Sequence, residues 1–405
     1  MKNFPNIMNY ELWIKIATFV PMKLNLLHLI IFIGAIFAFS ACNDSLDIPE
    51  EPEESVAIIY WMGDNSLTNW AEDDIQELVT GKDNIPTNSK IIIYADKADS
   101  RPIIYQLDAK NGLKVWKEFT KEQDCTDSLT LLNNLKDIVK NFPAKKYGLT
   151  FGAHGSGMVI NKRKALGPDQ SHNNNWLNIP TLRGILEQVP HMNYIFFDVC
   201  FMQGIEVAYE LRNVTDWVIG SPAEIPNPGA PYHIIAKDLC TGNIQGIVDG
   251  YHGYYPVSYK GASYKGTLLS AVKCSELEKL AESTSQYITN VFTNRQSIQG
   301  SVAQGIQKYS TEYSSYTYCY DINSIMNSIL PEDNYNNWLQ TFNNAVPIRE
   351  YNREWTAGHC SNPTIYDPEH YGGVSMYLPQ DEGNRNTELY QYQWYKAAGW
   401  DQTGW

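Results

Sequence analysis

The chain has 405 residues, with 45 acidic and 31 basic side chains and a formal net charge of -14. A chain of this length can bury a substantial core, in one large domain or two ordinary ones. An acidic chain without a basic stripe argues against nucleic acid as a partner, and against adhesion to anionic lipid through charge alone.

The N-terminal region carries a targeting signal. From Met22 the sequence reads MKLNLLHLIIFIGAIFAFSAC, an early lysine and an apolar stretch followed by small residues before Cys42. This pattern predicts a secretory leader, because the stretch is short and wrongly flanked for a typical membrane span. The F-S-A-C ending resembles a bacterial lipobox, in which the cysteine is lipidated. We expect a lipoprotein signal peptide over residues 1–42 with its true start at Met22; an uncleaved N-terminal anchor is the alternative.

An acidic segment follows the predicted lipidation site. Residues 43–54, NDSLDIPEEPEE, contain proline and cannot pack a core, so they predict a solvated tether. Acidic residues at this place also resemble the surface-export signal of Bacteroidetes lipoproteins. The sequence therefore predicts an exported protein anchored by lipid to the outer membrane, on its outer face.

In the first half of the mature chain, apolar runs alternate with amphipathic stretches. Five buried strands are predicted, at residues 56–63, 90–97, 147–155, 194–200 and 216–225. Helices are predicted between them, at 64–79, 127–142, 178–189 and 202–212, and PIIYQLD with KVWKEF alternates as a hairpin does. This order predicts an α/β fold with a mostly parallel sheet covered on both faces. Functional loops of such sheets gather beyond the carboxyl ends of the strands.

The second half is less regular. ELEKLAESTSQYITNVF predicts a long helix, and YSSYTYCYDINSI and GGVSMYLP predict further strands that could join the same sheet. We expect a core over residues 55–265 and a C-terminal α+β subdomain over residues 266–405.

The cysteines do not identify a metal site. Six follow Cys42, an even number that permits disulfides, although a fold of this size does not need them. The sequence has no CxxC pair and no cysteine–histidine cluster with zinc spacing, so no metal ligand is assigned.

Two strand ends carry residues suited to nucleophilic chemistry. His154 lies in A-H-G-S-G and Cys200 in F-F-D-V-C-F-M. If both strands are parallel in one sheet, these side chains can form a Cys/His pair, with a helix after Cys200 whose dipole would favour the thiolate. Gly155 would let a backbone N–H approach the oxyanion of a substrate. The alternatives are a buried structural cysteine and a solvated loop histidine.

This arrangement resembles the clostripain family of cysteine peptidases, grouped with caspases, legumains and gingipains. The matching segments are LTFGAHGSG, then IFFDVCFMQGIEVAYEL, with WMGDNSL, SPAEIPNPGAPY and GVSMYLP in the same order, roughly from Val56 to Pro379. The resemblance implies a caspase-like three-layer sandwich. Glu206 and Glu210, on the helix after the D-x-C motif, are interpreted as structural or surface residues.

The resemblance also implies roles for individual residues. Cys200 matches the nucleophile and His154 its partner, with backbone N–H groups of Gly155 and Cys200 as oxyanion donors. Asp198 matches the acidic residue that binds a basic P1 side chain, since a partly desolvated carboxylate would pair with Arg or Lys. The alternative is that Asp198 caps the helix that follows.

Family members are often activated by a cut between the histidine and the cysteine. The basic run NKRKALG, residues 161–167, lies in this interval, so self-cleavage after Arg163 or Lys164 is one interpretation and a solvated basic loop is the other. Calcium dependence occurs in the family, but no acidic loop here has EF-hand spacing. Calcium therefore stays unassigned, and no cofactor is required.

These features predict an exported cysteine endopeptidase that cleaves after Arg or Lys through an acyl-thioester. One alternative is a catalytically silent lipoprotein of the same fold that acts as a peptide or glycan receptor. Another is a cysteine-dependent amidase or transpeptidase, which would use the same residues with a different acceptor.

Overall fold

The computed structural model of the chain describes residues 52–158, 165–291, 305–309, 319–355, 365, 368–378 and 389–403. The compact unit to which they belong begins at Pro52. The predicted leader with Cys42 and the predicted cleavage sites Arg163 and Lys164 lie outside the described residues. Among the helices that are described, none combines the length and apolar character needed to cross a bilayer.

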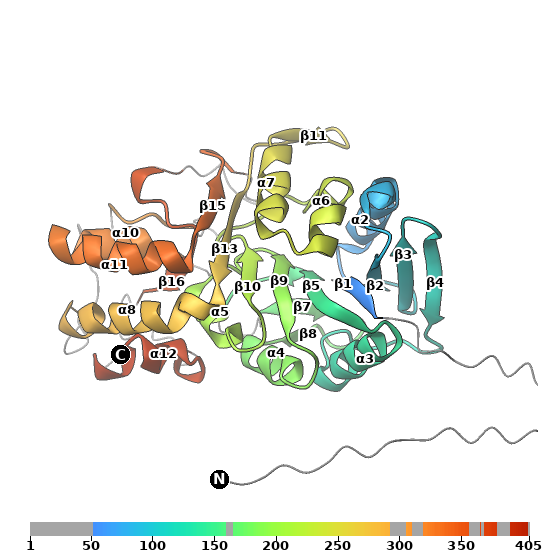
Figure 1. Cartoon of the computed structure of the whole chain (residues 1–405), viewed down its shortest axis with the longest axis horizontal. Helices are drawn as coiled ribbons and strands as arrows, with labels where there is room; N and C mark the ends of the chain where they lie inside the picture. Colours follow the sequence, from blue (N-terminus) through green and yellow to red (C-terminus); the bar gives the residue numbers. More distant parts are fainter. Residues whose placement is uncertain are drawn as a thin grey trace, which may run out of the picture. The chain divides into compact units, whose positions relative to one another are not determined.

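In the described part, nine strands form one sheet in the order β15-β13-β10-β9-β5-β1-β2-β3-β4 (Figure 1). Its central strands, β2, β1, β5, β9 and β10, are parallel, whereas β3, β4, β13 and β15 add to the two edges in antiparallel pairs. In sheet order the strands span Ile348–Tyr351, Leu268–Lys273, Trp217–Gly220, Met192–Asp198, Ala144–Gly152, Glu53–Gly63, Ser89–Lys97, Ile103–Asp108 and Gly112–Glu118. The predicted α/β fold with a mostly parallel sheet is confirmed.

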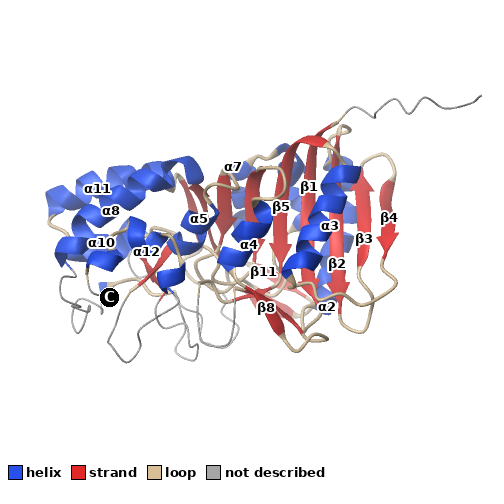
Figure 2. Cartoon of the chain, turned by 90° about the horizontal axis from the view of Figure 1, so that it is seen from below, coloured by secondary structure: helices blue, strands red, loops and turns tan. Residues whose placement is uncertain are grey.

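The sheet is parallel and central because its strands are apolar on both faces. Val56, Ile58, Tyr60 and Met62 of β1 pack into one core, and Ala57, Ile59 and Trp61 into the other. The first core lies beneath α3 (Ser128–Asn141), α4 (Ile179–Leu186) and α5 (Ile205–Leu211), which cross the front of the sheet in Figure 2. The second lies beneath α2 (Thr68–Gly81), α6 (Tyr232–Thr241) and α7 (Ile244–Tyr254). These are the three predicted layers.

The C-terminal part adds helices and strands differently from the prediction. The added sheet strands are β13 and β15, whereas β14 (Cys319–Asp321) and β16 (Ser375–Tyr377) pair with each other in a separate two-stranded sheet. The expectation that these last two segments extend the main sheet is therefore wrong. The carboxylate of Asp321 accepts the N–H of Ser324 and starts a helix, which ends the strand. The helices here are α8 (Leu277–Val291), α10 (Ile322–Ile329), α11 (Glu332–Ala345) and α12 (Trp394–Ala397).

Strand pairing sets the position of the functional edge. Gly152, the last residue of β5, pairs with Asp198, the last residue of β9. The chain then leaves β5, and His154–Gly155 form the short strand β6, so the predicted strand over 147–155 ends earlier than expected. β6 pairs with β7 (Leu166–Asp169), which pairs with β8 (Asn175–Leu177), in a small sheet of its own. A hairpin of β11 (Val257–Tyr259) and β12 (Ala262–Tyr264) completes the strands.

The turns after β5 and β9 are in direct contact. A Cβ atom on Gly155 would lie 2.2 Å from Cγ1 of Val199 and 2.7 Å from the carbonyl oxygen of Cys200. Gly157 has a φ of +65°, and its Cβ would lie 2.6 Å from the carbonyl oxygen of Phe201. The two glycines therefore allow a close approach that any side chain would prevent.

Two buried glutamates join α5 to the C-terminal part. Oε1 of Glu206 accepts the N–H of Tyr377 at 2.8 Å, and Oε2 of Glu210 accepts the N–H of Gln393 at 2.9 Å. Arg183 pairs with Glu210 at 2.7 Å. Burial raises the pKa of Glu206 to about 7, partly offset by its backbone hydrogen bonds. Of the two expected roles for these glutamates, the structural one is correct.

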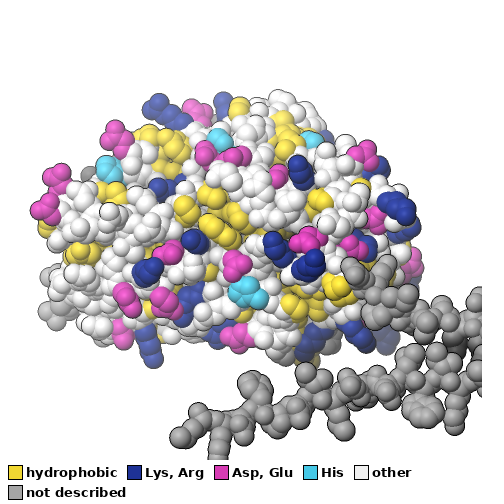
Figure 3. Space-filling model, viewed as in Figure 1, with side chains coloured by type: hydrophobic (Ala, Val, Ile, Leu, Met, Phe, Trp, Pro, Cys, Tyr) yellow, Lys and Arg dark blue, Asp and Glu magenta, His cyan; other side chains and the backbone are white. Residues whose placement is uncertain are grey.

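The surface is mixed in charge. On the face shown in Figure 3, dark-blue basic and magenta acidic side chains alternate over the same area. Several form exposed pairs, such as Lys145 with Glu54 at 2.8 Å. Such pairs contribute about 0–1 kcal/mol each, so the stability of the fold rests on the two apolar cores.

The substitution Glu206→Gln should make stability less dependent on pH. Because the folded-state pKa is raised above 4.5, the parent loses stability as the pH rises from about 4.5 through 7. The variant keeps an oxygen for the N–H of Tyr377 and should gain on the order of 3 kcal/mol relative to the parent between pH 5 and pH 8. Urea unfolding at both pH values measures this. Glu282→Gln, at an exposed position of α8, is the control; an equal response from both variants would contradict the assignment.

The substitution Gly155→Ala should destabilise the protein by about 1–3 kcal/mol, because the added methyl group overlaps Val199 and Cys200. Gly184→Ala is the matched control, since its Cβ would meet nothing within 4 Å and a helical alanine is favoured by roughly 0.5–1 kcal/mol. Thermal unfolding compares the two. An unchanged melting temperature for Gly155→Ala would mean that the turns are not in contact.

Candidate functional site

Cys200 lies just after β9, at the edge to which the parallel strands bring the turn of His154. Cys200 as a whole is half-buried. Phe201, which follows, has a φ of +61°, a left-handed conformation that costs a bulky residue free energy. The surrounding structure therefore holds the chain in a strained turn at Cys200, and this turn contacts the glycines after His154.

Burial raises the pKa of the Cys200 thiol to about 12; the N–H of Ile225, 3.4 Å from Sγ, lowers it in part, and the carboxylates of Glu224 and Asp198 raise it further. The helix expected to favour the thiolate through its dipole, α5, begins only at Ile205.

His154 contacts a residue that the sequence analysis missed. Its Nε2 lies 2.8 Å from Oγ of Ser66, in the segment that follows β1. The neighbouring Asn65 donates from Nδ2 to the carbonyl oxygen of Pro168 at 2.8 Å, which ties this segment to β7. Ser66 could have been found from the WMGDNSL segment, which follows a predicted strand of the parallel sheet. The carboxyl ends of parallel strands share one edge, so this segment lies at the same edge as His154.

Asp198 is buried at the end of β9, against α6 and α7. Oδ2 accepts the N–H of Ala230 at 3.0 Å and the hydroxyl of Tyr232 at 3.2 Å, and Oδ1 accepts the hydroxyl of Tyr251 at 3.0 Å. Burial raises its pKa to about 6, and these three donors oppose the rise. The alternative that Asp198 caps the following helix is wrong, because Gly204 occupies the N-cap of α5 and no side chain caps it.

Further carboxyl groups lie near Asp198. Asp74 and Glu77 are both on α2, and the charge of Glu77 adds to the negative potential at Asp198. Burial raises the pKa of Asp74 well above its ordinary value, and the charges of Asp198 and Glu77 add to the effect. A cation that reached this region would meet several carboxylates of reduced solvation.

The remaining cysteines in the described part are Cys125, Cys240, Cys274 and Cys319, and all are buried free thiols. Among the described residues, two side-chain groups could hold a metal ion, Asp96 with Cys125 and Asp169, and Asp124 with Asp169 and His172. Neither group includes His154 or Cys200. The edge described above offers a thiol and an imidazole, which are groups that acyl transfer can use.

Solved structures resemble this chain over most of its length. A secreted C11 cysteine protease from Bacteroides thetaiotaomicron, in complex with an irreversible peptide inhibitor, is 28% identical, with 86% of this chain and 99% of that chain covered and a TM-score of 0.75. An inactive zymogen C11 protease from Parabacteroides distasonis is 24% identical, with the same coverage and a TM-score of 0.74. Another secreted C11 protease from B. thetaiotaomicron is 23% identical, with 86% and 100% covered and a TM-score of 0.73. The last two support the fold alone.

The sequence was also compared with curated proteins and with family models. No curated protein matched it. The model of the clostripain family matches residues 59–405, which include the entire edge described above. The chain therefore belongs to the clostripain family and is a cysteine peptidase, a hydrolase.

Proposed function

We propose that this peptidase is an endopeptidase that cleaves after Arg or Lys, with Cys200 as nucleophile and His154 as its partner. The contact between the two turns, Gly155 against the backbone of Cys200, is the observation that carries this proposal. It supports a site in which an imidazole and a thiol act on one bond.

The proposed reaction has two steps. His154 takes the thiol proton of Cys200 as the sulfur attacks the scissile carbonyl, and the protonated imidazole then gives a proton to the leaving amine. Water hydrolyses the resulting thioester and restores the thiol. Backbone N–H groups of Gly155 and Cys200 stabilise the oxyanion, and Ser66 orients the ring of His154. This chemistry requires no cofactor, and no residue is assigned to calcium.

Asp198 is the proposed determinant of the basic P1 side chain. Its three donors hold the carboxylate in place, and with a pKa of about 6 it is largely ionised at neutral pH. Glu77 strengthens the negative potential around it. A guanidinium or ammonium group would compensate this buried charge, whereas an apolar P1 side chain would leave it unpaired.

Self-processing and export complete the proposal. The basic segment 161–167 lies between His154 and Cys200, which supports activation by cleavage, with Arg163 or Lys164 as the proposed site. The leader and Cys42 support an exported, lipid-anchored protein of the outer membrane, exposed at the cell surface. The structural relative at 28% identity, which is described as secreted, agrees with export.

Cys200→Ala should lower hydrolysis of a P1-Arg peptide amide by about a thousandfold or more, because no other group replaces the sulfur nucleophile. It should also abolish any new N-terminus in residues 161–167, as read by N-terminal sequencing after incubation. Cys240→Ala, which removes a buried thiol elsewhere, is the control and should be active.

An Arg-directed electrophile should label one thiol of the parent, at Cys200. Activity that survives in Cys200→Ala would overturn the mechanism.

Asp198→Asn should change specificity rather than activity in general. Removing one partner of a buried ion pair typically costs about 2–5 kcal/mol, so kcat/KM for P1-Arg should fall roughly 30-fold or more. The same peptide with citrulline, the neutral isostere of arginine, should lose much less. Asp249→Asn, at an exposed position of α7, is the control. Equal losses on both peptides would make Asp198 a structural residue.

A further inference from the structure

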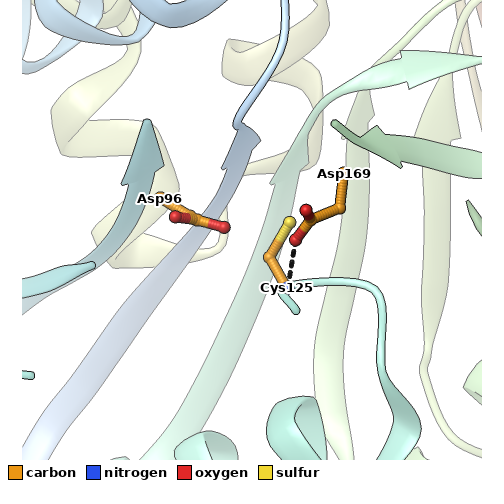
Figure 4. Close-up of side chains that lie close together, drawn as sticks. All are labelled: Asp96, Cys125 and Asp169. Atoms are coloured by element: carbon orange, nitrogen blue, oxygen red, sulfur yellow. Dashed lines mark hydrogen bonds between the residues drawn. The ribbon is translucent and has the colours of Figure 1, made fainter. Parts of the chain in front are cut away.

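Two buried acids and a buried thiol lie close together at the end of the sheet where the functional edge is. They are separate from the proposed pair His154 and Cys200. Asp96 lies near the end of β2, Cys125 just before α3, and Asp169 at the end of β7. All three have an exposed fraction of 0%. One ligand atom from each lies within 4.8 Å of the other two, and Figure 4 shows the Asp96 carboxylate directed at Cys125 and Asp169.

Asp96 is buried without a positively charged partner among the described residues. Within that part of the chain, no hydrogen bond of ordinary geometry reaches either of its carboxylate oxygens. Burial raises the pKa of Asp96 to about 9, and the acids Glu122, Asp169 and Asp64 add to the rise, whereas the thiol of Cys125 opposes it. Buried carboxyl groups in native proteins are almost always hydrogen-bonded or paired with a positive charge, so the Asp96 oxygens are suited to binding a cation.

Asp169 is held in the orientation that a metal ligand needs. Oδ2 accepts the N–H of Cys125 at 2.9 Å, the contact dashed in Figure 4. Oδ1 accepts the N–H of His172 at 2.9 Å and lies 3.0 Å from its ring Nδ1. Contacts of this kind fix the carboxylate, and Oδ2, with one hydrogen bond, keeps a lone pair for an ion.

We propose that Asp96, Cys125 and Asp169 bind one divalent metal ion of the zinc class. Zinc accepts thiolate sulfur at about 2.3 Å and carboxylate oxygen at about 2.0–2.2 Å, and ligands at these lengths fit within the 4.8 Å separation. Calcium fits less well, because it takes 6–8 oxygen ligands and a sulfur occupies one side of this group. On binding, the ion replaces the protons held by the Cys125 thiol and the Asp96 carboxyl group.

A surface hollow lies near these three residues. It has a volume of about 480 Å³ and is lined by residues that include Phe119, Glu122 and Ser171. Glu122 adds to the negative potential at Asp96, and Ser171 follows Asp169 closely in the chain, whereas the three proposed ligands themselves are fully buried.

Metal binding would brace the strand that supports His154. β7 ends at Asp169 and pairs with β6, where His154 is opposite Gly167. An ion shared by Asp96, Cys125 and Asp169 would connect β7 to the main sheet and to the start of α3. The role of the ion is therefore positional, since it touches neither His154 nor Cys200.

The test measures metal content in the full chain carrying Cys200→Ala, so that the active-site thiol does not bind metal. The protein is stripped with a chelator, dialysed against Zn²⁺ and analysed by elemental mass spectrometry. One zinc ion per chain is expected, and Asp96→Asn and Cys125→Ala should each weaken zinc affinity about 100-fold or more. Cys240→Ala should leave it unchanged. With Co²⁺, the thiolate-to-metal absorption band should vanish in Cys125→Ala alone.

Thermal unfolding distinguishes a loss of zinc binding from a defect in folding. Stripped Asp96→Asn should be at least as stable as stripped parent, because it loses a buried unpartnered carboxyl group, and Zn²⁺ should raise the melting temperature of the parent alone. Absent zinc binding, or binding unchanged in Asp96→Asn, overturns the site. Calcium binding that zinc does not displace overturns the zinc class. None of these results depends on peptidase activity. A failure of the proposed metal site therefore leaves the proposed function untouched, and the reverse also holds.

Discussion

The parallel pairing of β5 with β9 is the constraint on which the functional edge depends. Because Gly152 and Asp198 are partners in this ladder, the chain leaves both strands side by side. One exit carries His154 and Gly155, and the other carries Cys200. Residues of both strands pack into the apolar cores on the two faces of the sheet, which holds this pairing in place.

Three buried carboxyl groups differ in the hydrogen bonds that they accept. Glu206 accepts a backbone N–H and links α5 to the C-terminal part, so its burial serves the architecture. Asp198 accepts three donors on the face of α6 and α7, which fixes a charge there without neutralising it. Asp96 accepts none, although it is fully buried. This difference separates structural acids from acids available to a substrate or an ion.

The elements that were predicted well are those whose signal is local. The runs of β1, β2 and β5 are continuous and rich in β-branched or aromatic residues, and α3 has apolar residues at helical spacing. The predictions that were wrong depended on contacts between distant segments. β14 and β16 are apolar enough for strands, but nothing in their sequences identifies the partner of each. Burial, which raises the pKa of Cys200, also depends on how distant segments pack around the sulfur.

The sequence alone determined the order of strands and helices, and with it the edge to which His154, Asp198 and Cys200 belong. The reason is that apolar periodicity and parallel topology act through neighbouring residues and one rule of sheet geometry. Only the tertiary structure decided which groups surround these side chains. Ser66 reaches His154, Tyr232 and Tyr251 reach Asp198, and Asp96 meets Cys125 and Asp169, from segments far apart in the chain. Solvation and charge in a folded protein depend on such neighbours, and no local pattern encodes them.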